Sequence, residues 1–182
     1  MLLKRVLIAV CALALLAFTG CGGDDEKAED SGSSSTPTET TGTETTPAGP
    51  AGGKDSLGQP LDQKPKVEKP AGKPPKQLEV EDLAQGSGAE AQAGSQLTVQ
   101  YVGVSFKSGK QFDASWDNGQ PFPFQLGAGM VIPGWDQGLV GMKVGGRRKL
   151  TIPPELAYGP AGSGPIGPNE TLVFVIDLLE IA

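Results

Sequence analysis

Few side chains in this sequence can do covalent chemistry. The chain contains no histidine, and its two cysteines, Cys11 and Cys21, both lie near the N-terminus. The lack of histidine excludes a Ser-His-Asp triad, a histidine general base and a histidine-ligated zinc site. The aromatic residues are more suggestive: Trp135 follows a Pro-Gly pair in the apolar stretch MVIPGWDQGLVGM, and Phe112 stands next to Asp113. We therefore expect a site with aromatic walls and a carboxylate, without a metal or a cofactor.

The first twenty residues have the features of an export signal. Lys4 and Arg5 precede the apolar run VLIAVCALALLAF, which is too short to span a bilayer comfortably. The sequence AFTGC, ending at Cys21, resembles the lipobox of bacterial lipoproteins, although Phe18 stands where leucine is usual. This interpretation predicts a signal peptide over residues 1–20. It also predicts a lipid on Cys21 that anchors the protein outside the cytoplasm, on the cell membrane or on an outer membrane where one exists. The alternative is a plain secretory signal with a chance cysteine.

The net charge argues against a nucleic-acid function. It is −6 for the whole chain, and it becomes −8 if Lys4 and Arg5 leave with the signal. An acidic protein gains no electrostatic help towards nucleic acid or an anionic membrane surface. The basic run GGRRK, residues 145–149, is short and is predicted to be a solvated hairpin. With Cys11 removed and Cys21 lipidated, the mature chain has no thiol for a disulfide or a redox site.

Residues 21–76 are predicted to be a disordered tether. They comprise the charged segment DDEKAED, a Ser/Thr/Pro/Gly segment and the Lys-Pro segment KPKVEKPAGKPPK. Such a composition buries too little apolar surface to offset the entropy of the chain. The Lys-Pro half should be stiffer and rich in polyproline II conformation. We expect the whole region to act as a spacer.

From Gln77 to Ala182 the sequence has the patterns of one small folded domain. Alternation predicts strands in LEVEDL, QLTVQYVGVSF and RRKLTIP, while QFDASWD begins as a strand and FPFQLG is short and extended. The segment TLVFVIDLLEI is apolar on both faces, which favours a central strand. PGWDQGLVGMKVG has helical spacing, with Pro133 in its first turn and Gly145 at its end. These elements predict an α+β domain in which about five mostly antiparallel strands pack on one short helix.

The order of these segments resembles the FKBP-type peptidyl-prolyl cis-trans isomerases. The segments that carry the resemblance are VQYVG, SGKQFDAS, PFPFQLGAGMVIPGWDQGLVGMKVGGRRKLTIPPELAYG and TLVFVIDLLEI. They occur in the family's order, and the resemblance covers residues 77–182. It implies a twisted antiparallel sheet wrapped on a short helix, with a shallow aromatic pocket between them that binds a proline ring.

The same resemblance assigns individual residues to this pocket. It implies that Trp135 forms the floor, that the backbone N–H of Ile132 bonds the ligand, and that the Tyr158 hydroxyl donates to a substrate carbonyl. The residues expected to act on the rotating amide are Tyr101, Phe112, Asp113 and Tyr158. Those expected to bind the substrate are Phe122, Val131, Ile132, Trp135, Ile166 and Phe174. Without the family match, the strand aromatics would be plain core, Asp113 a turn cap and Tyr158 a loop anchor; Phe124 is assigned to the core in either case.

Isomerisation of an Xaa-Pro bond breaks no covalent bond, so a pocket of this kind needs no nucleophile. The barrier is the loss of amide resonance on twisting, about 18–20 kcal/mol. A catalyst must favour the twisted amide over the planar one, and an apolar pocket disfavours the more polar planar form. Two departures from well-studied family members bear on substrate and macrolide preference. Asn118 stands where they carry a basic residue, and the Gly-rich loop near Ser163 is one residue shorter and lacks their histidine.

Two functions from different classes remain open. One is a monomeric, extracytoplasmic isomerase that assists the folding of exported, proline-containing polypeptides and is inhibited by macrolides of the rapamycin class. The other is a non-catalytic domain that holds proline-containing segments, as a chaperone or a surface adhesin. The complete set of pocket residues favours the isomerase, whereas the shortened loop with Ser163 favours binding alone.

Overall fold

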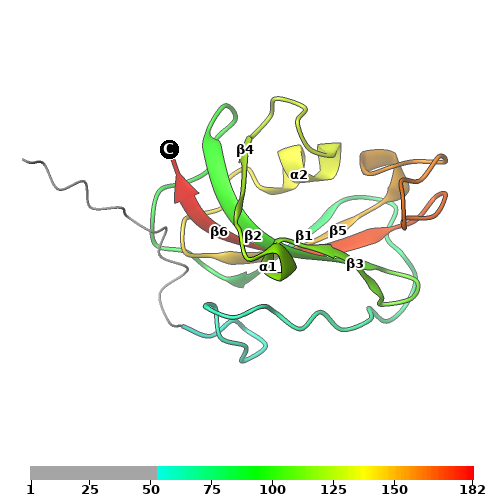
Figure 1. The fold of residues 1–182 in the computed structure, drawn as a ribbon, viewed down its shortest axis with the longest axis horizontal. Helices are drawn as coiled ribbons and strands as arrows, with labels where there is room; N and C mark the ends of the chain where they lie inside the picture. Colours follow the sequence, from blue (N-terminus) through cyan, green and yellow to red (C-terminus); the bar gives the residue numbers. More distant parts are fainter. Residues whose placement is uncertain (1–52) are drawn as a thin grey trace, which may run out of the picture. The chain divides into compact units, whose positions relative to one another are not determined.

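The computed structural model describes residues 53–182, in which an antiparallel sheet packs on one short helix (Figure 1). The strands are β1 (Glu79–Ala84), β2 (Gln96–Ser105), β3 (Gln111–Ala114), β4 (Phe122–Gln125), β5 (Arg147–Ile152) and β6 (Leu172–Ile181). The helical elements are α1 (Ser115–Asn118), α2 (Pro133–Gly138) and the 3₁₀ helix η1 (Pro154–Leu156). The strand order is β1-β5-β6-β2-β3, and β4 also pairs with β2. The predicted α+β class is confirmed, with six strands in the described part of the chain.

Strand β6 lies at the centre of the sheet. It pairs with β5 from Leu172 to Asp177 and with β2 from Leu172 to Ile181, antiparallel in both cases. Its first eight residues are all buried. The central position predicted from its two apolar faces is therefore confirmed, because both faces of the sheet are covered at this strand.

Helix α2 packs very closely on β5, and two glycines allow the approach. A β-carbon on Gly134 would lie 2.4 Å from a side-chain carbon of Ile152, and one on Gly138 would lie 2.7 Å from a side-chain carbon of Leu150. These glycines lower helix propensity, but any larger residue would push the helix off the sheet. The helix ends sooner than the sequence pattern predicts, at Gly138. It stops there because Gly141 and Gly145 take positive φ values of 78° and 84°, which continue no α-helix.

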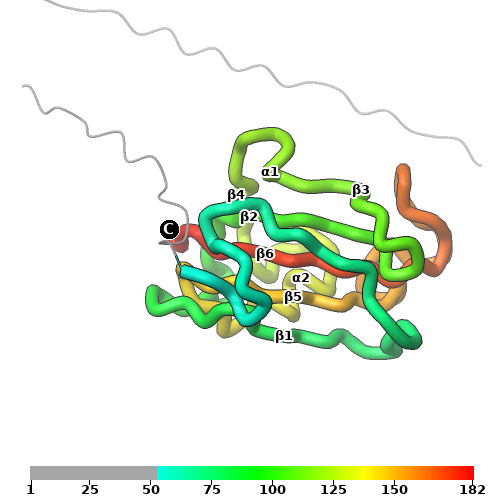
Figure 2. The backbone as a smooth tube through the Cα atoms, turned by 90° about the horizontal axis from the view of Figure 1, so that it is seen from below, coloured from blue at the N-terminus to red at the C-terminus, as the bar shows by residue number. Residues whose placement is uncertain are grey.

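Residues 53–76, named here the strap, cross the face of the sheet opposite α2 (Figure 2). Asp55, Leu61 and Pro65 are buried, and Val67 packs against the cluster of Val102, Val104, Phe106, Ala114 and Val173. The prediction that this part of the chain is a spacer that builds no core is therefore wrong for residues 53–76. Its few apolar side chains are enough because they fall on an apolar face that the sheet already presents.

The two arginines of the GGRRK run are buried rather than solvated. The side chains of Arg147 and Arg148 are 0% and 9% exposed. Arg148 binds Asp82 of β1 through two nitrogens, at 2.6 and 3.1 Å, and donates to the carbonyl oxygens of Gly138 and Val140 at the end of α2. The prediction that this run is solvated is thus wrong for its two arginines. They begin strand β5, as the RRKLTIP pattern predicted, and Arg148 ties β1 to the C-terminal end of the helix.

Residues 1–52 lie outside the described part of the chain. The predicted signal peptide, the lipidation of Cys21 and the first part of the predicted tether fall there. No helix within residues 53–182 is long and apolar enough to cross a membrane.

Candidate active site

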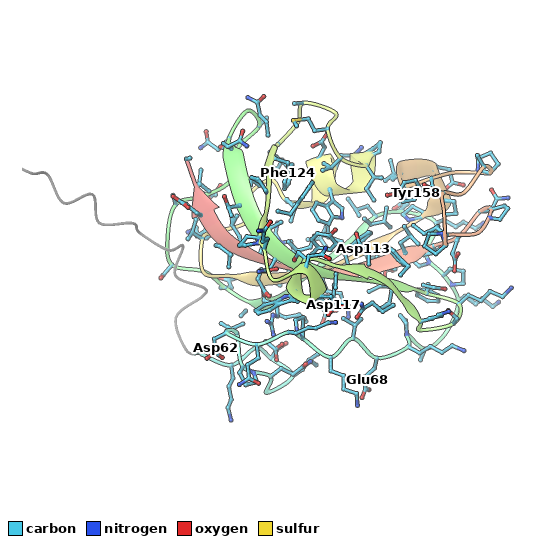
Figure 3. The ribbon with its side chains drawn as sticks, in the orientation of Figure 1. Asp62, Glu68, Asp113, Asp117, Phe124 and Tyr158 are labelled. Carbon is cyan, nitrogen blue, oxygen red and sulfur yellow. The ribbon has the colours of Figure 1, made fainter. Side chains whose placement is uncertain are left out.

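A cavity of 180 Å³ opens between α2 and the sheet. Figure 3 shows Phe124 and Tyr158 on this side of the sheet, with Asp113 at its margin. The cavity is lined by Tyr101, Phe112, Asp113, Phe122, Met130, Val131, Ile132, Trp135, Tyr158 and Phe174. The structure thus brings together nine of the ten pocket residues that the sequence suggested.

Trp135 is the central ring of this site. Its side chain is 4% exposed, because α2 holds it against the sheet. The ring centres of Tyr101 and Phe174 lie 5.1 and 5.2 Å away, and both stand edge-on to the indole. Phe124 packs on its other flank at 5.7 Å. Edge-to-face packing of this kind fixes ring orientations as well as burying area, so Trp135 is both core and pocket wall. Phe124 is fully buried, as expected for a core residue.

Gly103 of β2 makes room for two of the pocket rings. A β-carbon there would lie 2.7 Å from the ring of Phe112 and 2.8 Å from the ring of Phe174. The two rings instead pack on each other across the bare backbone, with centres 5.5 Å apart. The sequence analysis missed this residue. A glycine inside an otherwise well-formed strand was the signal that pointed to it.

The carboxylate of Asp113 binds a tyrosine rather than a turn. Its Oδ2 accepts a hydrogen bond of 2.5 Å from the hydroxyl of Tyr101, and no backbone N–H within residues 53–182 donates to it. Burial, the bond to Asp113 and the negative charge of Asp113 all raise the pKa of Tyr101 well above its usual range. Tyr101 is therefore protonated, and a hydrogen-bond donor, at neutral pH.

Helix α1 ties both partners of this hydrogen bond to the sheet. The sequence predicted that QFDASWD begins as a strand, and the structure shows that β3 turns directly into α1 after Ala114. Ser115, the first residue of α1, accepts the backbone N–H of Tyr101 at 2.8 Å and donates to the side chain of Gln100. Because Ser115 lies two residues after Asp113, one short segment positions the acid and anchors the tyrosine.

Two hydrogen-bond donors at the rim of the cavity are unused within residues 53–182. The backbone N–H of Ile132 has no acceptor there. Ile132 is the extended residue directly before α2, with φ −61° and ψ 146°, so its N–H lies outside the hydrogen-bond pattern of the helix. The hydroxyl of Tyr158 likewise has none, and this side chain is 39% exposed. Both residues line the cavity, and both donors keep free hydrogen-bonding capacity within the described part of the chain.

Ile166 is the one suggested pocket residue that does not line the cavity. It is buried in the main core at 7% exposure. Ser163 and Ile166 exchange two backbone hydrogen bonds of 2.9 Å each, so the short Gly-rich loop folds on itself and turns Ile166 inward. Met130, which the sequence analysis missed, stands at the rim instead and is 66% exposed.

The loop before α2 is fixed by the residue that follows Trp135. The carboxylate of Asp136 accepts the backbone N–H groups of Gly127 and Gly129, at 2.8 and 3.1 Å. Both glycines have positive φ values, 78° and 69°, as their turn requires. This turn leads into Met130 and Val131 at the rim of the cavity. The side chain of Asp136 therefore connects the rim to the helix that carries Trp135.

This arrangement is a shallow aromatic cavity with one carboxylate and two free donors, and comparison with known proteins assigns it. The model of the FKBP-type peptidyl-prolyl cis-trans isomerases matches residues 88–179, half of the chain. This chain belongs to that family. The resemblance seen in the sequence is thus confirmed, and the protein is a peptidyl-prolyl isomerase.

Curated relatives and solved structures agree with this FKBP-type assignment. An FK506-binding protein of Streptomyces anulatus is 58% identical over 112 residues, which cover 60% of this chain and 90% of the relative. A probable FK506-binding protein of Corynebacterium glutamicum is 53% identical over 109 residues, 60% of this chain and 91% of the relative. The crystal structure of AtFKBP13 covers 58% of this chain and 93% of its own, with 41% identity and a TM-score of 0.55. That of FkpA from Escherichia coli covers 57% of this chain and 47% of its own, with 43% identity and a TM-score of 0.53.

The cavity-lining residues of this FKBP-type isomerase, from Tyr101 to Phe174, all lie within the matched region. The strap does not, since it ends twelve residues before the match begins. The family comparison therefore accounts for the catalytic domain and leaves the strap as a feature of this chain that needs its own explanation.

Proposed function

We propose that the cavity binds the proline of an Xaa-Pro segment and speeds its cis-trans isomerisation without a covalent intermediate. The observation that carries this proposal is the pairing of Asp113 with Tyr101: among the described residues, the one carboxylate that lines a mainly aromatic cavity already accepts a tyrosine hydroxyl. No nucleophile is placed there to attack a carbonyl, and rotation about the amide requires none.

The volume of the cavity fits this substrate. A space of 180 Å³ equals about six water molecules at liquid density, which suits a five-membered ring and its carbonyl. The rings of Trp135, Phe122 and Phe174 enclose the pyrrolidine and remove the imide from water. The planar, charge-separated amide loses more hydration than the twisted one, so the barrier falls.

The polar groups at the rim would hold the flanking chain. The N–H of Ile132 and the hydroxyl of Tyr158 are free to donate to carbonyl oxygens on either side of the proline. The Tyr101–Asp113 pair borders the carbonyl that rotates. Anchoring the flanks while one carbonyl turns converts binding energy into a bias towards the twisted state.

An exchange assay tests the catalytic proposal. The full-length protein is added to an Ala-Leu-Pro-Phe-type peptide, and cis-trans exchange is followed by NMR. We expect line broadening that is abolished by the double substitution Phe112→Tyr, Asp113→Val. Binding of the peptide without faster exchange would refute catalysis and leave the domain as a holder of proline segments. The inward fold of the loop at Ile166, which removes one wall residue, is the observation that favours this second function.

Macrolide binding is a separate expectation. Relatives of this chain are named FK506-binding proteins, and we propose that FK506 or rapamycin occupies the same cavity. Titration should quench or shift the fluorescence of Trp135 and inhibit exchange at the same concentration. Inhibition without a change at Trp135 would place the ligand elsewhere.

We further propose that the isomerase acts on exported proteins from a lipid anchor at Cys21. The proposal rests on the export signal and the AFTGC sequence. Metabolic labelling with an alkyne fatty acid should label the protein, and Cys21→Ser should abolish the label and release the protein from membranes. A labelled Cys21→Ser variant would refute the anchor.

A further inference from the structure

The strap is held to the sheet by a buried arginine. Arg147 binds Asp177 of β6 through two nitrogens, at 2.5 and 3.0 Å, and Asp55 of the strap at 3.3 Å; all three side chains are 0% exposed. The remaining donors of the guanidinium reach the carbonyl oxygens of Pro60, Leu61 and Gln63, at 3.1, 3.4 and 3.0 Å. Asp55 also accepts the N–H groups of Leu57 and Gln59 and so closes the turn at the start of the strap. These bonds fix the path of residues 55–63.

Beyond this clamp, the strap contacts α1. Lys64 forms an ion pair of 2.5 Å with Asp117, whose other oxygen accepts from Gln111 of β3 at 2.7 Å. The ammonium of Lys64 and the amide of Gln111 together hold the pKa of Asp117 below its usual value. Val67 and Trp116 pack on the same apolar cluster of the outer sheet face. Figure 3 shows Asp117 on the strap side of the sheet, close to where Asp113 reaches the opposite side.

The segment that the strap contacts has few other supports: Ala114 and Trp116 pack on the outer cluster, and Ser115 bonds Gln100 and the backbone of Tyr101. Strand β3 has four residues and pairs only with β2, with an irregular register between Gly103 and Val104. Helix α1 is also only four residues long, and no side chain caps its N-terminus. Yet this segment carries Phe112 and Asp113, and through Ser115 it anchors Tyr101. Any shift of α1 therefore moves both partners of the Tyr101–Asp113 hydrogen bond.

We propose that the strap is a positioning element of the active site, in which Lys64 and Val67 hold α1 and α1 holds the Tyr101–Asp113 pair. This role rests on the isomerase function proposed above. The part of the chain needed for full activity then begins within the strap, N-terminal to the region that matches the family model. The strap packs on the outer cluster, on the sheet face opposite α2 and Trp135 (Figure 2), so it should influence the rotation of the amide more than the binding of proline.

Charge reversal in the full-length chain tests the proposal. Lys64→Glu and Asp117→Lys should each lower kcat about 2- to 5-fold, the range expected for loss of one partly exposed ion pair. The double variant, which restores the pair in reverse, should recover most of the lost rate. Lys73→Glu is the matched control, because Lys73 is an exposed strap lysine without an ion pair among residues 53–182. It should keep the wild-type rate.

Two further readouts separate positioning from general stability. The dissociation constant for a non-isomerising proline ligand should change less than 2-fold in Lys64→Glu, while the backbone NMR shifts of Phe112 and Asp113 and the ring shifts of Tyr101 should move and return in the double variant. Val67→Ser should produce the same shifts through the apolar contact. Unchanged shifts and rates in Lys64→Glu and Val67→Ser would overturn the proposal.

The result also distinguishes this inference from the proposed function. If the wild-type chain failed to speed exchange, the catalytic proposal would fall, and the NMR shifts at Asp113 and Tyr101 would still decide whether the strap positions them. If the wild type is active and the double variant stays as slow as the single variants, positioning through the Lys64–Asp117 pair is wrong.

Discussion

Replacing Gly103 with alanine should damage the active site more than the fold. The added β-carbon would lie 2.7 Å from the Phe112 ring and 2.8 Å from the Phe174 ring, whereas carbon atoms in contact prefer about 3.5–4.0 Å. Each ring must therefore withdraw by about 1 Å. Overpacking of this kind costs about 1–3 kcal/mol of stability, and a displacement of about 1 Å at a reacting centre can cost about 100-fold in rate.

The assay compares kcat/KM with the free energy of unfolding in the same samples. We expect Gly103→Ala to lose about 10- to 100-fold in kcat/KM, while it still unfolds cooperatively in urea. Val102→Ala is the control. Val102 is the neighbour of Gly103 in β2, is 2% exposed and packs in the outer cluster. That change should cost about 1–3 kcal/mol of stability. It reaches the cavity only through the outer cluster, so it should lower kcat/KM no more than the roughly 2- to 5-fold expected of the strap variants. Wild-type kcat/KM in Gly103→Ala would refute the idea that this glycine shapes the cavity.

Three other changes follow from the structure. Trp135→Leu should keep the fold but weaken proline-ligand affinity at least 10-fold, as measured by titration calorimetry; unchanged affinity would make Trp135 plain packing. Tyr101→Phe removes the hydrogen bond to Asp113 and should lower kcat by about 10-fold, roughly the effect of one charge-assisted hydrogen bond, with little change in the melting temperature. Burial raises the pKa of Asp177 from 3.8 to about 6, and nearby Asp55 adds to this while Arg147 opposes it. The folded state therefore binds the extra proton, so the stability that this group contributes is fully present below pH 4 and is lost as pH rises through 6. The free energy of unfolding, measured in urea, should fall by up to about 3 kcal/mol as pH rises over that window. In Asp177→Asn this dependence on pH should largely disappear.

The charges of the buried cluster explain why stability falls, rather than rises, with increasing pH. One guanidinium faces two carboxylates, so the cluster carries a net negative charge where all three side chains are fully buried. Pairing with both carboxylates outweighs burial at Arg147 and raises the pKa of the guanidinium, which keeps its proton. The excess charge is therefore relieved at a carboxyl group. If stability rose between pH 4 and pH 6 in the wild type but not in Asp177→Asn, this account of the cluster would be wrong.

Local pattern was sufficient for the strands and for most of the site. Alternation along β2, the doubly apolar β6 and the Pro-Gly start of α2 report backbone period and burial directly. Because the pocket residues fall within or beside these elements, their grouping followed once the family order of the segments was recognised. Ile166 was assigned to the cavity and Met130 was missed, because both lie in loops, where the direction of a side chain depends on hydrogen bonds across the loop rather than on any period.

The strap shows most clearly what could not be predicted from the sequence. By composition, residues 53–76 cannot form a core of their own, and that inference from the sequence is sound for an isolated segment. They are ordered because the sheet supplies what they lack: an apolar outer face for Val67 and a buried arginine whose donors match the strap carbonyls. The sequence by itself determined the fold class and the aromatic character of the site, since these depend on residue type and spacing. Only the tertiary structure decided that Arg147 and Arg148 are buried, that Gly103 opens the cavity and that the strap contacts α1, because each depends on a partner distant in the chain.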